Sequence, residues 1–443
     1  MKRLFPVLLL LISFISEAQN TMYFMERLPQ NIAYNPAIMP KMKFFVGLPG
    51  IGGTAVQAYN SGFNFNQLDE FGTNLKNDNY NPDDFVKSIG DYNLFTAEAS
   101  MNVLSFGFKL KEKGYLSFLV TMNSLLINKA ASDIAYLVSD LDNLSNESFP
   151  IIVDDISVTA NNYLNFGFTY SRIINEHLTL GITPRINFNQ FGLKTSDLSF
   201  KIDLDESAIG SPDDEYIQTF TGEAVLGLPT EINPDARNNG ELDLDAGLLN
   251  ENWIDDISFG SILKNKSLMV DIGATYEIEK WTFSASLLNI GASSFKTNAY
   301  ELRGNNDKVL INEAEKIKIG IPAKLYIGAM RQFSPKWNYA LLFNNNFYKS
   351  GSVATATASL NGYIGSALST SISYTAGYKY DNIGIGLRFR FFPGTDFYLV
   401  TDNIIQAFNY KNAYRLTAAA GINISIGIKD EMVVPADLPV ESK

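Results

Sequence analysis

The sequence predicts an all-β fold, a transmembrane antiparallel β-barrel of about fourteen strands, within a range of about twelve to sixteen. Apolar and polar side chains alternate along many segments, which is the period of a β-strand. The segments are about ten residues long, enough for a tilted strand to cross a bilayer. Short turns and long polar stretches alternate between them, as expected when the two ends of a barrel face different compartments.

The clearest example is the predicted hairpin over residues 268–291. From 268 to 278 the even-numbered side chains are apolar, whereas the odd-numbered ones after Met269 are small, polar or charged. Glu279 and Lys280 interrupt the pattern for two residues, after which it resumes. The simplest interpretation is a strand, a tight turn and a second strand.

The same rhythm predicts one N-terminal strand, six hairpins and one closing strand. Glycines and a proline between Gly47 and Gly53 predict a kink or bulge in the first strand. An even total places both ends of the barrel, residues 43–428, on the short-turn side, which is periplasmic in bacterial barrels. The expected strands are 43–59, 101–111, 116–122, 158–172, 178–191, 268–278, 281–287, 321–332, 337–347, 352–363, 369–379, 383–391, 397–405 and 413–428.

The composition fits a sheet with one apolar face and one polar, hydrated face. The chain of 443 residues has 31 Phe and 22 Tyr, yet its mean hydropathy is −0.02. It has no cysteine, which excludes disulfides, thiol chemistry and a lipidated N-terminal cysteine. The net charge of −12 gives no electrostatic footprint for nucleic acid.

Residues 1–18 have the pattern of a signal peptide. Lys2 and Arg3 precede an apolar run of about twelve residues, and small residues lead to a cleavage site after Ala18. The run is too short for a membrane-spanning helix, which needs about twenty residues. Residues 19–42 are apolar but irregular, so this N-terminal segment is expected either to plug the barrel from the periplasmic side or to lie against its rim.

Four long stretches are assigned to extracellular loops and one to a periplasmic tail. In the second loop, apolar residues near helical spacing over 124–149 predict a surface helix. The third loop holds fifteen acids and one base between Asp203 and Asp256, as a solvated outer surface would. The loops are residues 60–100, 124–157, 192–267 and 292–320, and the tail is residues 429–443.

Paired carboxylates in the acidic loop leave a second alternative open, the binding of a divalent cation. Asp243 with Asp245, and Asp255 with Asp256, bring hard oxygen ligands together, so a structural calcium ion is what they would take. No EF-hand spacing accompanies them, and a solvated loop explains the same residues. No other cofactor is expected.

The sequence does not point to an enzyme. Its single histidine, His177, falls in a predicted periplasmic turn, and there is no cysteine, so a nucleophile with an adjacent base is not expected. The large aromatic side chains at the strand ends are better interpreted as membrane-interface residues than as a ligand site. They are Tyr276, Trp281, Trp337 and Tyr339.

Six charged side chains fall on the predicted inner face of the barrel. One interpretation is a network of mutually paired charges, because an isolated charge there would be costly. The other is the selectivity lining of a pore. The six residues are Lys109, Arg185, Asp271, Glu277, Arg388 and Arg390.

Two sets of short motifs stand out: the stretches 271–276 (DIGATY) and 287–291 (LLNIG), and the run Asn35, Pro36 and Ala37. The first set resembles a hairpin, and the second the N-terminal segment, of outer-membrane barrels of the Bacteroidota that are related to FadL and to the type IX secretion barrel PorV. The whole mature chain is most similar to a family of such barrels of uncharacterised function. The resemblance implies the fold and carries over no ligand-contacting residue.

Two functions follow as hypotheses. The first is a non-catalytic structural or accessory subunit of an envelope complex for secretion or outer-membrane assembly, with membrane lipid and other envelope proteins as partners. The second, implied by the FadL resemblance, is a channel for hydrophobic or small solutes. Both place the chain in the outer membrane of a Gram-negative cell after signal-peptide cleavage. A lateral gap beside the kink at Gly47–Gly53, joined to an apolar pocket, would favour the channel.

Overall fold

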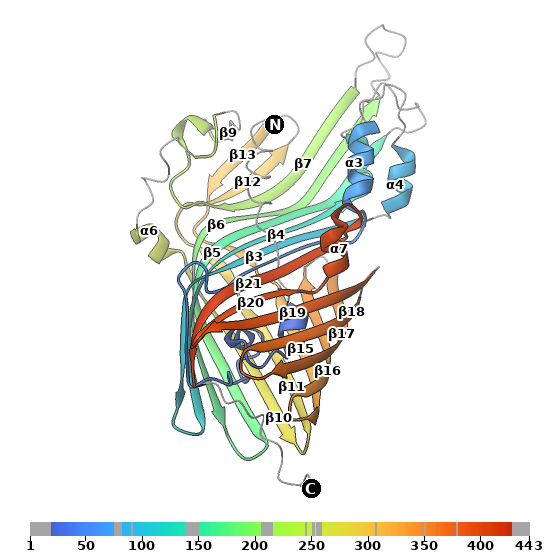
Figure 1. Cartoon of the computed structure of the whole chain (residues 1–443). Helices are drawn as coiled ribbons and strands as arrows, with labels where there is room; N and C mark the ends of the chain where they lie inside the picture. The colour runs from blue at the N-terminus through green and yellow to red at the C-terminus, as the bar shows by residue number, and fades with distance from the viewer. Residues whose placement is uncertain are drawn as a thin grey trace, which may run out of the picture.

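The structure, a computed structural model, consists mainly of strands that wrap into one barrel (Figure 1). The signal peptide predicted at 1–18 and the tail predicted at 429–443 lie outside the described residues. Within the described part of the chain, no helix is both long enough and apolar enough to cross a membrane. The structure describes residues 19–74, 82–89, 92–137, 150–204, 216–243, 246–249, 253, 259–305, 308–349, 351–377 and 380–427.

The barrel wall is one closed antiparallel sheet. β1 (Phe44–Gly47) and β2 (Thr54–Asn60) pair in turn with the same two neighbours, β3 and β21, so they share one place in the ring. The described ring has fourteen places when they are counted as one. The other strands follow in chain order: β3 (Tyr92–Leu110), β4 (Gly114–Ala131), β5 (Ile151–Ile173), β6 (Leu178–Leu204), β10 (Lys266–Ile278), β11 (Trp281–Phe295), β15 (Ala323–Ser334), β16 (Trp337–Tyr348), β17 (Gly351–Ile364), β18 (Leu368–Gly377), β19 (Tyr380–Phe392), β20 (Thr395–Thr401) and β21 (Arg415–Ile426).

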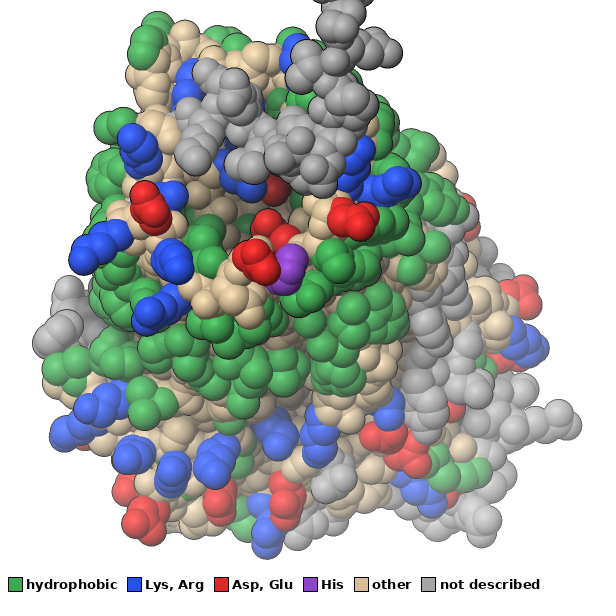
Figure 2. Space-filling view, turned by 90° about the horizontal axis from the view of Figure 1, so that it is seen from below, with side chains coloured by type: hydrophobic (Ala, Val, Ile, Leu, Met, Phe, Trp, Pro, Cys, Tyr) green, Lys and Arg blue, Asp and Glu red, His purple; other side chains and the backbone are tan. Residues whose placement is uncertain are grey.

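The wall is apolar outside and largely polar inside, and β16 shows this clearly. Tyr339, Leu341 and Phe343 are 38%, 62% and 42% exposed, whereas Asn338 and Asn344 on the other face are buried. A water-soluble barrel would show the reverse, so this wall is built to face lipid. Seen from the short-turn end, hydrophobic side chains form a broad band, with Lys and Arg gathered on either side of it (Figure 2).

The two ends of the barrel differ. Tight turns join β3 to β4 and β10 to β11 at the lower end in Figure 1. There Trp281 packs edge-on against Tyr339, and the Arg331 guanidinium lies over the indole ring, a grouping suited to a membrane interface. Longer connections lie at the opposite end. They carry α3 (Phe65–Asn74), α4 (Asp83–Ile89), α7 (Ile404–Phe408) and η5 (Tyr410–Asn412).

A sheet extension rises above the barrel at the long-loop end. β7 pairs with the upper part of β6 and with β12, and β12 pairs with β13. Leu226, Tyr300 and Ile311 are buried together between these strands. The expected loops at 192–267 and 292–320 are therefore partly strand, because apolar residues far apart in sequence pack into a common core. The added elements are β7 (Tyr216–Gly227), η4 (Pro234–Ala236), β8 (Arg237–Asn238), β9 (Glu241–Leu242), α6 (Phe259–Lys264), β12 (Ala299–Asn305), β13 (Lys308–Glu313) and β14 (Ile317–Gly320).

The helix predicted at 124–149 is wrong over its first part. β4 runs on to Ala131, paired with β3 as far as Ala131 and with β5 as far as Lys129, and only α5 (Ile134–Leu137) is helical among the described residues of that stretch. Long-range pairing outweighs the local spacing, and Leu125 and Ile127 pack with Tyr348 across the lumen. Residues 138–149 lie outside the described chain.

Candidate functional site

The N-terminal segment, residues 19–42, lies inside the barrel and fills part of the lumen. It contains α2 (Gln19–Met22) and η1 (Pro29–Ala33), and most of its apolar side chains are buried. Met25 and Leu28 pack against Val400 of β20, while Tyr23 stacks on Tyr326 of β15, with ring centroids 5.5 Å apart. Of the two arrangements left open for this segment, the structure has the plug.

The last part of the plug is held by the Asn35-Pro36-Ala37 motif. The Asn35 amide accepts from the Ala37 backbone N–H (2.9 Å) and donates to the Tyr23 hydroxyl (2.9 Å). Ser171 donates to the Pro36 carbonyl (2.5 Å), which ties the turn to β5. The asparagine therefore both shapes the turn and bonds it to the rest of the plug.

Two glycines make room for this motif in the wall. Gly181 of β6 and Gly273 of β10 are cross-strand partners. A Cβ on Gly181 would overlap the backbone of Pro36, and a Cβ on Gly273 would overlap the Asn35 side chain. The glycine of the DIGA stretch thus belongs to a notch that admits the N-terminal motif, which links the two motifs that the sequence presents separately.

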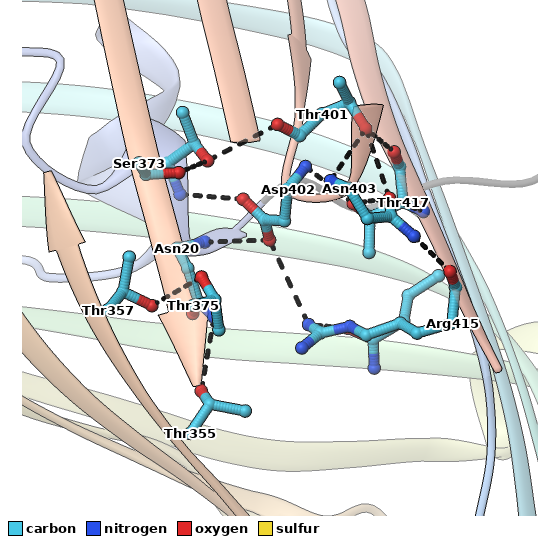
Figure 3. A network of polar contacts seen from close by, with 12 residues as sticks. Asn20, Thr355, Thr357, Ser373, Thr375, Thr401, Asp402, Asn403, Arg415 and Thr417 are labelled. Atoms are coloured by element: carbon cyan, nitrogen blue, oxygen red, sulfur yellow. Dashed lines mark hydrogen bonds and ion pairs between the residues drawn. The ribbon is translucent and has the colours of Figure 1, made fainter. Parts of the chain in front are cut away.

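The first part of the plug is hydrogen-bonded to a buried carboxylate (Figure 3). Asp402, just beyond β20, accepts from the backbone N–H groups of Asn20 (3.3 Å) and Thr21 (2.8 Å). The Thr21 hydroxyl lies 2.7 Å from that of Ser373 on β18, and Arg415 of β21 approaches Asp402 to 4.0 Å. Hydrogen bonds fix this end, and Gly384 of β19 leaves room for the Thr21 side chain.

The middle of the plug meets the wall near the short turns. Arg27 is buried, donates to the Gly365 carbonyl (2.7 Å) and lies over the Tyr363 ring. Beside it, the predicted lumen residues Arg388 and Arg390 both bond Asp396, at 2.5 and 2.8 Å. These two arginines form a paired charge cluster with an acid that the sequence analysis did not single out.

A cavity of about 180 Å³ lies between the plug and the wall formed by β2 to β6, β10, β11, β15 and β20. The plug contributes apolar side chains to it, and β3, β4, β5 and β6 contribute mainly polar ones. Because the lining comes from elements spread over the whole chain, no local pattern predicts it. Its lining includes Met22, Ile32, Tyr34, Gly53, Asn102, Ser105, Thr121, Asn165, Thr183, Leu288, Tyr326 and Tyr398.

Two ion pairs border this cavity. Arg185 donates to Asp271 (2.6 Å) and to Asn289, and the Asn289 backbone N–H also donates to Asp271 (2.7 Å). On another side, Lys324 pairs with Glu98 (2.5 Å), and both are buried. The first pair joins two of the predicted lumen charges. The second joins residues 226 positions apart, which no sequence pattern connects.

The remaining predicted site residues lie elsewhere. Lys109 and Glu277 are exposed near the short turns, and the Glu277 carbonyl lies 2.8 Å from the His177 ring nitrogen. Asp243 is exposed in the upper sheet extension, whereas Asp245, Asp255 and Asp256 lie outside the described residues. No cluster of potential metal ligands occurs in the part of the chain that the structure describes.

The cavity reaches the interruption between β1 and β2. Residues 48–53 leave the ladder but stay bonded to both neighbours: Gly50 N–H donates to Asn102 on β3 (3.0 Å), and Leu48 N–H donates to Ile422 on β21 (3.2 Å). The φ of Gly50, +74°, requires glycine at this bend. Gln30 of the plug donates to the Gly52 carbonyl (2.9 Å), so the bend points into the lumen.

Several solved structures are similar to this chain. They include the Ralstonia pickettii toluene transporter TbuX (9% identity, 90% of this chain and 94% of that chain covered, TM-score 0.40). A deltaS2 mutant of the TodX monoaromatic hydrocarbon channel has 10% identity, 93% and 96% coverage and a TM-score of 0.42. A Pseudomonas aeruginosa FadL homologue has 9% identity, the same two coverages and a TM-score of 0.40. Identities this low transfer neither a solute nor a residue role.

Sequence comparison identifies the family. No curated protein matches the chain. The model of a family described as "Family of unknown function (DUF5723)" matches residues 36–318 and 305–402, which together include most of the barrel. The chain therefore belongs to this family.

Proposed function

We propose that the protein is a channel that carries small solutes across the outer membrane. The outward-facing apolar rows suit a bilayer, and the signal peptide expected at 1–18 suits export to the envelope. In this proposal the solute enters from the long-loop end, rests in the cavity beside the plug and leaves where β1 and β2 are interrupted.

One observation carries the proposal: the cavity extends to Gly53, where a wall strand is split into β1 and β2, each of which pairs with both β3 and β21. The bend between β1 and β2 is held by a few backbone hydrogen bonds, including Gly50 to Asn102 and Leu48 to Ile422, instead of a continuous ladder. A short segment held in this way opens at a lower free-energy cost than a paired strand does. An exit at this position therefore needs little rearrangement of the wall.

The accessory-subunit hypothesis, placed first from the sequence alone, has less support. A scaffold needs a stable barrel and an outer surface, but neither a cavity nor an interrupted strand beside it. Both features cost stability, because a cavity forfeits packing contacts and a broken ladder forfeits hydrogen bonds. Their coincidence at Gly53 favours the channel.

Uptake by intact Gram-negative cells that express the protein tests the channel. Three labelled one-ring solutes, toluene, p-cresol and p-toluate, are compared with cells that carry an empty vector. The Thr121→Trp variant fills the cavity, since Thr121 lines it. Met122→Trp is the matched control, because Met122 is the next residue and is 36% exposed on the outer face.

The channel proposal predicts that at least one solute enters cells that express the protein several-fold faster than cells that carry the empty vector. Thr121→Trp should return that rate to background, and Met122→Trp should not. If none of the three solutes enters faster than in the vector control, or if both variants behave alike, the channel proposal fails. Gel mobility before and after heating checks that each variant forms a closed barrel.

A further inference from the structure

The cavity has two chemically different sides. The plug and its neighbours supply an apolar side with Ile32, Tyr34, Leu288 and Tyr326. The inner faces of β3 to β6 supply hydroxyl and amide groups, which belong to Asn102, Ser105, Ser117, Thr121, Asn165, Thr169 and Thr183. A plain hydrocarbon would satisfy the first side and offer no hydrogen bond to the polar groups of the second.

The size of the cavity limits the solute to about one ring. An apolar protein cavity of about 150 Å³ holds a benzene molecule. The present cavity measures about 180 Å³, which leaves room for a ring with one or two small substituents. A long acyl chain does not fit without movement of the plug.

The ion pairs make a charged solute unfavourable. Arg185 with Asp271, and Lys324 with Glu98, are salt-bridged at 2.6 and 2.5 Å, so the ionised groups at the cavity sum to zero. An added carboxylate or ammonium would have to break one of these pairs or remain without a counter-charge. The cavity is therefore suited to a neutral molecule.

Two polar atoms of residues that line the cavity have no partner among the described residues, the Oδ1 atom of Asn102 and the Nε atom of Arg185. The Nδ2 group of Asn102 donates to Ser105 (2.7 Å), whereas its Oδ1 atom accepts no hydrogen bond, although the residue is only 5% exposed. Asn102 lies where β3 bulges, opposite the interruption between β1 and β2. An unpartnered acceptor at this place is matched by a solute that brings a hydroxyl donor.

We infer that the channel takes a neutral solute of about one ring that carries a hydroxyl group. The hydroxyl donates to Asn102 Oδ1, and the ring packs against the apolar side formed by Tyr34, Leu288 and Tyr326. This inference rests on the proposed channel and specifies its solute class. Asn102 then selects the solute next to the interruption between β1 and β2, where the solute is proposed to leave.

Equilibrium dialysis of the purified protein in detergent tests the solute class. p-Cresol, toluene and p-toluate have nearly the same ring size and differ in being a neutral donor, a hydrocarbon and an anion. The Thr121→Trp variant gives the background of solute dissolved in micelles. We expect p-cresol to bind about threefold to tenfold more tightly than toluene, the worth of one hydrogen bond, and p-toluate to bind more weakly than p-cresol.

Asn102→Leu should abolish the preference for p-cresol over toluene while keeping the ring-sized cavity. Asn344→Leu is the matched control, since Asn344 is equally buried, also has an amide atom without a partner and does not line the cavity. The inference is overturned if toluene binds as tightly as p-cresol, if Asn102→Leu keeps the preference, or if none of the three solutes binds. Toluene binding together with toluene uptake would overturn the solute class but leave the channel standing.

Discussion

The two ends of the plug are held in different ways. At its start, the backbone N–H groups of Asn20 and Thr21 donate hydrogen bonds to the buried carboxylate of Asp402. At its end, Pro36 fits into a notch formed by Gly181 and Gly273. Water can replace hydrogen bonds when a segment leaves its site, but it cannot replace a close fit between backbones. We therefore expect the start to be released more readily than the end at Pro36.

Single-cysteine reporters can measure this difference, because the natural chain has no cysteine. Thr21→Cys reports on the start and Ala37→Cys on the end, and both positions are buried. A thiol reagent labels each position at a rate proportional to the fraction of time that the site is open. The labelling rate of each variant is compared with that of the reporter protein that carries only the cysteine substitution.

The largest effect is expected from Gly181→Ala. The new methyl group would overlap the Pro36 backbone, which cannot rotate away as a side chain can. Overpacking of this kind costs about 3 kcal/mol, so labelling of Ala37→Cys should rise on the order of a hundredfold. Gly167→Ala is the control, because a Cβ there meets only ordinary contacts on the neighbouring strand β5. Equal rates in the two variants would show that the notch does not hold the plug.

A smaller change is expected from Asn35→Ala. This variant loses the hydrogen bonds to Ala37 and Tyr23, which together contribute about 2 kcal/mol, and labelling of Ala37→Cys should rise about thirtyfold. Asn31 is equally buried in the same segment, yet within the described part of the chain its side chain makes a single, long hydrogen bond of 3.5 Å. Asn31→Ala should therefore have a clearly weaker effect, and the opposite order would contradict the role given to Asn35.

Asp402→Asn should act on the start alone. The neutral amide keeps the shape of the carboxylate but accepts less strongly from the Asn20 and Thr21 N–H groups, a loss of about 1.4 kcal/mol. Labelling of Thr21→Cys should rise about tenfold, while that of Ala37→Cys stays the same. A parallel rise at both positions would mean that the plug moves as one body.

The smallest effect is expected from a covalent lock at the start. The hydroxyls of Thr21 and Ser373 are 2.7 Å apart, which suits a disulfide between cysteines at these positions. Since the proposed exit lies at the interrupted strand, this lock should leave solute uptake within about twofold of its unlocked value. The control is a pair in the wall, Thr357 and Thr375, with hydroxyls 2.8 Å apart on neighbouring strands. Uptake that stops on oxidation only in the Thr21 pair would show that the start must move.

The hairpins of the barrel could be predicted because the alternation of apolar and polar residues within each strand is local in the sequence. In β10, Val270 and Ile272 alternate with Asp271 and Gly273 within a few residues, so the period of the strand is visible locally. The helix expected from 124 failed for the converse reason: Leu126 and Ala130 have helical spacing, but pairing with β3 and β5 decides the conformation. The upper sheet extension was missed because Tyr300 and Ile311 are packed by residues from distant strands.

The candidate site was predictable only in part. Arg185 and Asp271 were found from the face that they share with other lumen positions, and they do meet. Glu98 and Lys324 were missed, because only the closed ring brings them together across 226 positions. Asn35-Pro36-Ala37 was noticed as a motif, but its role needed the two glycines of the notch. Asp402 carried no signal at all, since it lies just past a strand in an ordinary polar stretch.

Closure of the ring by β21 against β1 and β2 has a consequence for biogenesis. The first wall strand pairs with the last one, so the ring cannot close before the C-terminal strand is in place. The N-terminal segment is joined directly to β1 and lies inside the closed ring. A chain cut short before β21 would therefore lack both a closed wall and the enclosure of this segment.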